Sequence, residues 1–171
     1  MPRIFSKTGP QRGIRLEIVR RRGYRGLPAR RVRAIVEGVL RELDRPPCGV
    51  SVLFTGDAEM RALNKKFRRR DRSTDVLSFP WEGPPGEPYL GDIAISVPTA
   101  RRQAARAGWR IGEELEFLLL HAVLHLLGHD HETDTGEMDR IQTRLARTLL
   151  GRGIPGIELA PARRPSRGSR S

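Results

Sequence analysis

Cysteine is almost absent from this chain, because Cys48 is the single cysteine among 171 residues. One thiol excludes an internal disulfide and is typical of a protein that works in a reducing compartment, so we expect a cytoplasmic protein. The N-terminal residues also lack the apolar segment of a secretory signal peptide, which agrees with that expectation.

Long hydrophobic runs are absent as well. The longest apolar stretch, from Phe117 to Leu127, is too short to cross a membrane and is interrupted by two histidines. We therefore expect no membrane partner. With 37% apolar residues over its whole length, the chain is long enough to form one domain with a real hydrophobic core.

Acidic residues are scarce at both ends of the chain. Residues 1–33 carry eleven Lys or Arg against one acidic residue, and residues 152–171 carry five Arg against one. Basic ends favour a polyanionic partner such as RNA, since phosphate contacts release counterions, although a merely solvated tail is the plainer alternative. We expect a flexible basic arm over residues 1–12, a single domain over residues 13–151 and a disordered Arg/Pro/Ser-rich tail after it.

Hydrophobic periodicity predicts an α+β fold with about four strands and with helices around a central buried helix. We expect the strands to form one small mixed sheet. Asp57 is predicted to be the N-cap of the second helix. Neither the order nor the direction of the strands can be read from the pattern. The predicted strands are residues 14–20, 50–54, 76–79 and 90–96, and the predicted helices are residues 28–43, 58–67, 98–108, 113–127 and 138–149.

All four histidines lie in the stretch from Glu113 to His131, which begins as the central helix. His121 and His125 are four residues apart, so both imidazoles lie on one helical face, one turn apart. Apolar residues surround the rest of this helix, which predicts that it is buried. A buried imidazole pair at this spacing is typical of two ligands of one metal ion, although ordinary hydrogen bonds would also satisfy it.

Gly128 is predicted to end this helix in the left-handed conformation, so that the chain turns back towards the histidine pair. His129 and His131 are the candidates for a third ligand. We favour His131, because a reversed chain needs a few residues to return, whereas His129 would stack on His125 only if the helix continued. Three nitrogen ligands describe an open zinc site. A closed structural site would need a further ligand, for which the candidates are His129, Asp130 and Cys48.

The spacing of these histidines and of Gly128 also matches the HExxHxxGxxH motif of the metzincin proteases, with one departure. Ala122 stands where those enzymes carry the glutamate that serves as general base. Peptide hydrolysis in those enzymes needs a carboxylate to shuttle the proton. A metalloprotease is therefore the weaker alternative.

A basic loop follows the second predicted helix. Six Lys or Arg residues fall within the eight positions from Lys65 to Arg72. Guanidinium groups bind phosphate oxygens through paired hydrogen bonds, so this loop is a candidate phosphate-binding site, with a solvated turn as the alternative.

Three separated stretches are considered together. They are LNKKFRRRDRSTDVLSFP from Leu63 to Pro80, LGDIAIS from Leu90 to Ser96, and HAVLHLLGHDH from His121 to His131. In this order they resemble the YbeY family of endoribonucleases. The resemblance covers about residues 14–150, and the terminal arms lie outside it.

The resemblance implies a zincin-like fold and a zinc-dependent endoribonuclease specific for single-stranded RNA, with one Zn²⁺ and no small-molecule cofactor. By that resemblance, His121, His125 and His131 ligate the metal and Arg68 is needed for RNA cleavage. The implied partners are ribosomal RNA and the small ribosomal subunit, in maturation of the small-subunit rRNA 3′ end and in ribosome quality control. A zinc-containing RNA- or ribosome-binding module without activity is the other alternative. The general base stays open, with candidates Asp75, Asp130 and Glu132.

Overall fold

The computed structural model describes residues 14–84, 87–129 and 135–151. The expected N-terminal arm and C-terminal tail lie outside these residues. Along the described chain the elements are β1 (Leu16–Arg20), α1 (Ala29–Glu42), β2 (Gly49–Thr55), α2 (Asp57–Arg68), β3 (Val76–Pro80), β4 (Tyr89–Ser96), α3 (Val97–Ala107), α4 (Ile111–Leu126) and α5 (Glu137–Leu150).

The four strands form one mixed sheet in the order β1-β2-β4-β3. β1, β2 and β4 pair in parallel, and β3 pairs antiparallel with β4 at one edge. Parallel neighbours need a crossover connection, which α1 supplies between β1 and β2. The predicted α+β class, with four strands in a mixed sheet, is confirmed.

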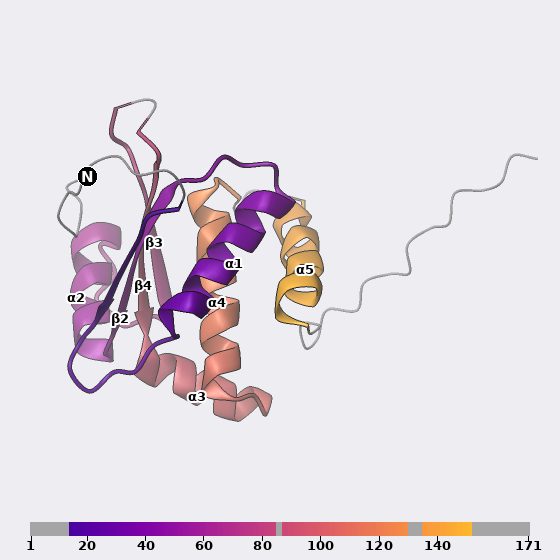
Figure 1. Ribbon diagram of the computed structural model, residues 1–171. Helices are drawn as coiled ribbons and strands as arrows, with labels where there is room; N and C mark the ends of the chain where they lie inside the picture. Colours follow the sequence, from indigo (N-terminus) through magenta and orange to yellow (C-terminus); the bar gives the residue numbers. More distant parts are fainter. Residues whose placement is uncertain (1–13, 85–86, 130–134, 152–171) are drawn as a thin grey trace, which may run out of the picture.

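The helices cover the sheet unequally (Figure 1). α2 lies on one face, whereas α1 and α4 lie on the other, with α5 packed on the outer side of those two helices. α4 contacts α1, α3, α5, β3 and β4. The prediction of a central helix is therefore confirmed. None of the helices in the described part of the chain is long and apolar enough to cross a membrane.

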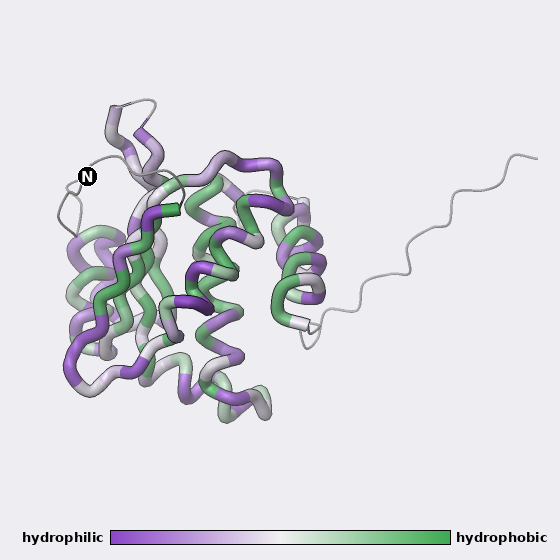
Figure 2. The backbone as a smooth tube through the Cα atoms, viewed as in Figure 1, coloured by the Kyte–Doolittle hydropathy of each residue, from purple (hydrophilic) through white to green (hydrophobic). Residues whose placement is uncertain are grey.

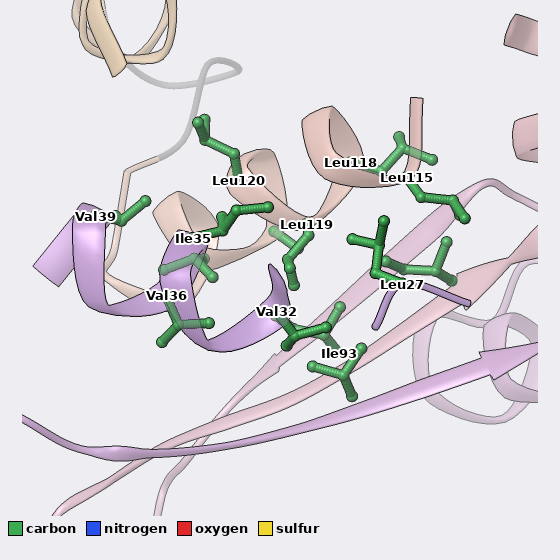
Figure 3. Packing of buried hydrophobic residues seen from close by; sticks show 14 of the residues in the cluster. Leu27, Val32, Ile35, Val36, Val39, Ile93, Leu115, Leu118, Leu119 and Leu120 are labelled. Atoms are coloured by element: carbon green, nitrogen blue, oxygen red, sulfur yellow. The ribbon is translucent and has the colours of Figure 1, made fainter. Parts of the chain in front are cut away.

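The main core fills the space between the sheet, α1 and α4 (Figure 3). Val32 and Ile35 of α1 lie against Leu119 of α4, and Ile93 of β4 closes the cluster from the sheet. Each such side chain is at most 1% exposed, and its burial contributes about 1.5 to 3 kcal/mol. Figure 2 shows apolar and polar residues on opposite sides of α5, with the apolar residues on the side towards α4.

The start of α2 differs from the prediction. Asp57 is the first residue of the helix, and Gly56 is the N-cap, without a side-chain hydrogen bond. The prediction of Asp57 as a cap was wrong because its carboxylate accepts hydrogen bonds from Ser96 and Thr99 instead. The same carboxylate therefore connects the start of α2 to the start of α3.

Gly91 lies at an irregular point of β4. Its φ is +146°, and a Cβ there would lie 2.3 Å from the carbonyl oxygen of Phe79 in the neighbouring strand. The register between β2 and β4 shifts at the same place. Only glycine fits this backbone conformation and this close approach.

Candidate functional site

His121 and His125 lie near the C-terminal end of α4 with their rings close together. Their Nε2 atoms are 3.0 Å apart, and the ring centroids are 4.5 Å apart. Both side chains are half-buried. The other faces of α4 are occupied by core leucines, so the histidine face is the part of the helix left for a site.

The chemistry and spacing of this pair fit a divalent metal ion. Zinc–nitrogen bonds of about 2.0 to 2.1 Å in a tetrahedral site place two ligand nitrogens about 3.3 to 3.4 Å apart. The observed Nε2 separation of 3.0 Å is close to that span. In the described part of the chain, no group of three or more His, Cys, Asp or Glu side chains gathers as a metal site, so the ligand roles stay a prediction.

The helix ends before Gly128, which adopts the left-handed conformation, as predicted. Gly128 has φ +89° and donates its N–H to the carbonyl of His125 at 3.0 Å. The N–H of His129 donates to the carbonyl of Leu124 at 3.1 Å, and these two bonds form a Schellman motif. The helix therefore does not continue through Gly128, and His129 does not stack on His125. The favoured third ligand, His131, lies outside the described residues.

A groove of about 860 Å³ opens beside the histidine pair. Its walls come from the end of α2, the loop after it, β3, α3 and the end of α4. Both histidines line it together with Arg68, Arg70 and Arg72. The fold thus brings the basic loop and the histidine motif, which are far apart in the sequence, to one surface.

Arg68 is the last residue of α2 and is held against β3. Its guanidinium donates to the carbonyl of Ser78 at 3.1 Å. The Ser78 hydroxyl, in turn, donates to the carbonyl of Ala122 on α4 at 3.2 Å. One residue of β3 therefore connects Arg68 to the histidine helix.

Hydrogen bonds hold the basic loop in a defined conformation. Asn64, which is 4% exposed, donates its side-chain amide to the carbonyl of Arg72 at 2.8 Å and accepts from the N–H of Arg70 at its backbone carbonyl. Asp71 in the middle of the loop forms an ion pair with Arg61 at 2.7 Å. These contacts order the loop, but residues 68–72 are all exposed, so phosphate binding by this loop stays a prediction beside the solvated turn.

Asp75 is the candidate base that lies within the described residues, and it lines the groove. One carboxylate oxygen accepts from the Thr74 hydroxyl and from the N–H of Val76, and the other accepts from Gln103 at 2.8 Å. Burial, and then the negative charge of Asp75, raise the pKa of the nearby Glu114 carboxyl. Both oxygens of Asp75 are therefore engaged in structural hydrogen bonds. The other two candidates, Asp130 and Glu132, lie outside the described residues.

Two further sequence hypotheses concern Cys48 and Ala122. Cys48 packs at the edge of the main core, where burial raises the pKa of its thiol, and it does not line the groove in the described part of the chain. Ala122 is fully buried in the same core. The position that carries the metzincin glutamate therefore faces the core in this fold.

Sequence reasoning missed Gln142 of α5, whose side-chain oxygen lies 2.6 Å from Nδ1 of His121. Gln142 follows Met138 by four residues and precedes Leu145 by three, so a polar side chain on the buried face of that helix was the available signal. Ser78 and Asn64 were also missed, because their roles depend on contacts between elements.

Known proteins are similar to this chain over most of its length. Residues 20–150 match the family described as Endoribonuclease YbeY. The Endoribonuclease YbeY of Solibacter usitatus is 47% identical over 135 residues, which cover 77% of this chain and 87% of that protein. The one from Thermus thermophilus is 44% identical over 137 residues, covering 76% and 97%.

A solved structure supports the fold independently. The solution structure of a Thermotoga maritima protein superposes with a TM-score of 0.55 at 25% identity, covering 85% of this chain and 99% of that one. Together with the extent of the family match and the identity to the curated relatives, this shows that the chain belongs to the YbeY family of endoribonucleases.

Proposed function

We propose that this protein is a metal-dependent endoribonuclease that cuts single-stranded RNA during maturation of ribosomal RNA. Its proposed target is the small-subunit rRNA near its 3′ end, within the cytoplasm, with a further part in ribosome quality control. The observation that carries the proposal is the meeting of the histidine pair and three arginines in one groove. Membership of an endoribonuclease family supports the reaction class.

The proposed metal is one zinc ion held by His121 and His125, with His131 as the third ligand. When bound, zinc would supply Lewis-acid chemistry to a phosphodiester. The protein's own contribution is to hold the Nε2 atoms of these two imidazoles 3.0 Å apart in the absence of metal, which is close to the separation of two ligand nitrogens at zinc. Holding them there reduces the ordering that binding requires.

Arg68 is proposed to bind a phosphate oxygen of the RNA and to stabilise the extra negative charge of the pentacovalent phosphorane. The hydrogen bond from Nη2 of Arg68 to the Ser78 carbonyl fixes the orientation of the guanidinium. The other N–H groups of this planar guanidinium are donors suited to phosphate. Arg70 and Arg72 line the same groove and are proposed to contact the RNA backbone.

The test of Arg68 uses a neighbouring arginine as the control. Arg68→Ala should slow cleavage of single-stranded RNA roughly 10²-fold, equivalent to about 3 kcal/mol of transition-state stabilisation. Arg69 is adjacent and has φ +57°, a conformation that asparagine tolerates. Arg69→Asn removes the same charge and should leave the rate nearly unchanged. Full activity of Arg68→Ala, with zinc retained, would refute the assignment.

The nucleophile is a water molecule or the RNA 2′-hydroxyl, and the product ends distinguish them. A 2′,3′-cyclic phosphate requires attack by the hydroxyl, whereas hydrolysis by water gives none. Mass spectrometry of the cleaved oligonucleotide reads this directly.

Chelation separates the proposal from its alternatives. An open catalytic site should lose RNase activity while circular dichroism reports most of the fold intact, whereas loss of a structural zinc should unfold the domain. A casein assay beside the RNA assay, each with and without chelator, tests the metalloprotease alternative. Cleavage of casein but not of RNA would overturn the proposal.

A further inference from the structure

Gln142 lies on the inward face of α5, opposite His121 of α4. Its side chain is 6% exposed, and its Oε1 atom is 2.6 Å from Nδ1 of His121. Met138 and Leu145, which share this face of α5, are fully buried. Apolar packing of α5 thus sets the position from which Gln142 reaches the histidine.

This contact selects one tautomer of His121. An amide oxygen can only accept a hydrogen bond, so Nδ1 of the imidazole must carry the proton. A neutral imidazole carries a single N–H, and Nε2 therefore presents a lone pair. That Nε2 atom is the one 3.0 Å from Nε2 of His125.

We propose that Gln142 is a positioning residue that fixes the tautomer and ring orientation of His121 for binding a divalent metal ion. The inference rests on the metal site proposed above and assigns Gln142 no contact with metal or RNA. Partners of this kind, which accept a hydrogen bond from a ligating histidine, typically change metal affinity by roughly 10- to 100-fold when removed. A glutamine that merely satisfies a buried imidazole would alter stability without this effect on affinity.

Three variants of the full chain isolate this role. Gln142→Met keeps the length and apolar packing of the side chain but removes the amide oxygen. Gln142→Glu restores an oxygen acceptor at the same distance. Thr143→Val is the matched control, because Thr143 is the next residue of α5, is fully buried, and has a hydroxyl without a hydrogen-bond partner among the described residues.

The first readout is zinc affinity, measured by competition with a chromogenic chelator at one fixed pH. Gln142→Met should bind zinc roughly 10- to 100-fold more weakly, whereas Gln142→Glu and Thr143→Val should bind close to the unaltered protein. Equal affinity of Gln142→Met and the unaltered protein would overturn the inference, and so would a loss of affinity in Gln142→Glu that Thr143→Val does not share.

The second readout is the tautomer of His121 in metal-free protein, from the ¹⁵N chemical shifts of its ring nitrogens. The unaltered protein and Gln142→Glu should carry the proton on Nδ1, and Gln142→Met should shift it towards Nε2. An unchanged tautomer in Gln142→Met contradicts the inference. If the unaltered protein binds no zinc, the proposed function and this inference fail together, whereas zinc binding that is insensitive to Gln142→Met removes only the inference.

Discussion

The carboxylate of Asp57 joins the start of α2 to the start of α3 beside the groove. It accepts hydrogen bonds from the hydroxyl of Ser96 at 2.5 Å, from the hydroxyl of Thr99 at 2.7 Å and from the guanidinium of Arg102 at 2.8 Å. Thr99 also lines the groove. Asp57→Asn keeps the size of this side chain and removes its charge, so it tests how much the network contributes to stability.

The magnitude follows from the pKa of Asp57. Burial alone would raise this pKa, but the hydrogen bonds from Ser96, Thr99 and Arg102 outweigh burial and lower the pKa from 3.8 to about 2. A shift of that size corresponds to about 2.4 kcal/mol. Because the side chain is 36% exposed, solvent screening reduces the expected contribution to about 1 to 2 kcal/mol.

The sign of the pH dependence is also defined. A carboxyl whose pKa is lower in the folded state stabilises the protein above its unfolded pKa of 3.8, and the contribution falls by roughly half at pH 3. Urea unfolding of the unaltered protein and Asp57→Asn should therefore differ by about 1 to 2 kcal/mol at neutral pH and by less in acid. Asp139→Asn is the control, since Asp139 lies exposed in the first turn of α5. Like Asp57→Asn, it removes a negative charge near the N-terminus of a helix, so both variants lose the same favourable interaction with the helix dipole. A difference that stays constant from neutral pH to pH 3, or that equals that of the control, would refute the reasoning.

Two further predictions concern backbone strain and buried polarity. Gly91→Ala should lower the free energy of unfolding by at least about 3 kcal/mol, because its Cβ would meet the Phe79 carbonyl at a positive φ. Gly112→Ala is the control, because a Cβ there meets nothing within 4 Å, and it should be neutral or stabilising by up to about 1 kcal/mol. Urea unfolding measures the free energy of unfolding of both variants. Equal effects of the two substitutions would contradict the prediction for Gly91. Thr143→Val should raise the free energy of unfolding by about 1 kcal/mol, because it removes a buried hydroxyl without a partner in the described part of the chain. A lower melting temperature would instead indicate that this hydroxyl is satisfied.

Much of the fold could be predicted because periodicity is a local property. The alternation in residues 14–20 predicts β1, and the apolar stripe after Pro28 predicts α1, each within two residues of the observed bounds. The order of strands was not predictable, since alternation shows which face is buried but not which strand is the neighbour. The error at Asp57 has a similar origin. An aspartate before a helix can cap that helix or accept hydrogen bonds from a distant element, and the sequence does not distinguish the two roles.

The candidate site was predictable where the spacing of residues along one helix determines their relative positions. The four-residue interval of His121 and His125 predicts two rings on one helical face, and the rings lie together in the structure. Gln142 reaches His121 across a helix interface, which no interval in the sequence encodes. The metal role of the pair stays a prediction that zinc analysis tests.

The two halves of the groove depend on the placement of one strand. Ser78 of β3 accepts from Arg68 through its carbonyl and donates through its hydroxyl to Ala122 of α4, the residue after His121. Shifting β3 by one residue would exchange its buried and exposed faces, and both contacts would then be lost together. The pairing of β3 with β4, in which Ser78 lies opposite Ile93, therefore sets the position of Arg68 relative to the histidines. Because Ile93 is itself fixed in the main core, core packing determines the separation of the two groups proposed to act on RNA.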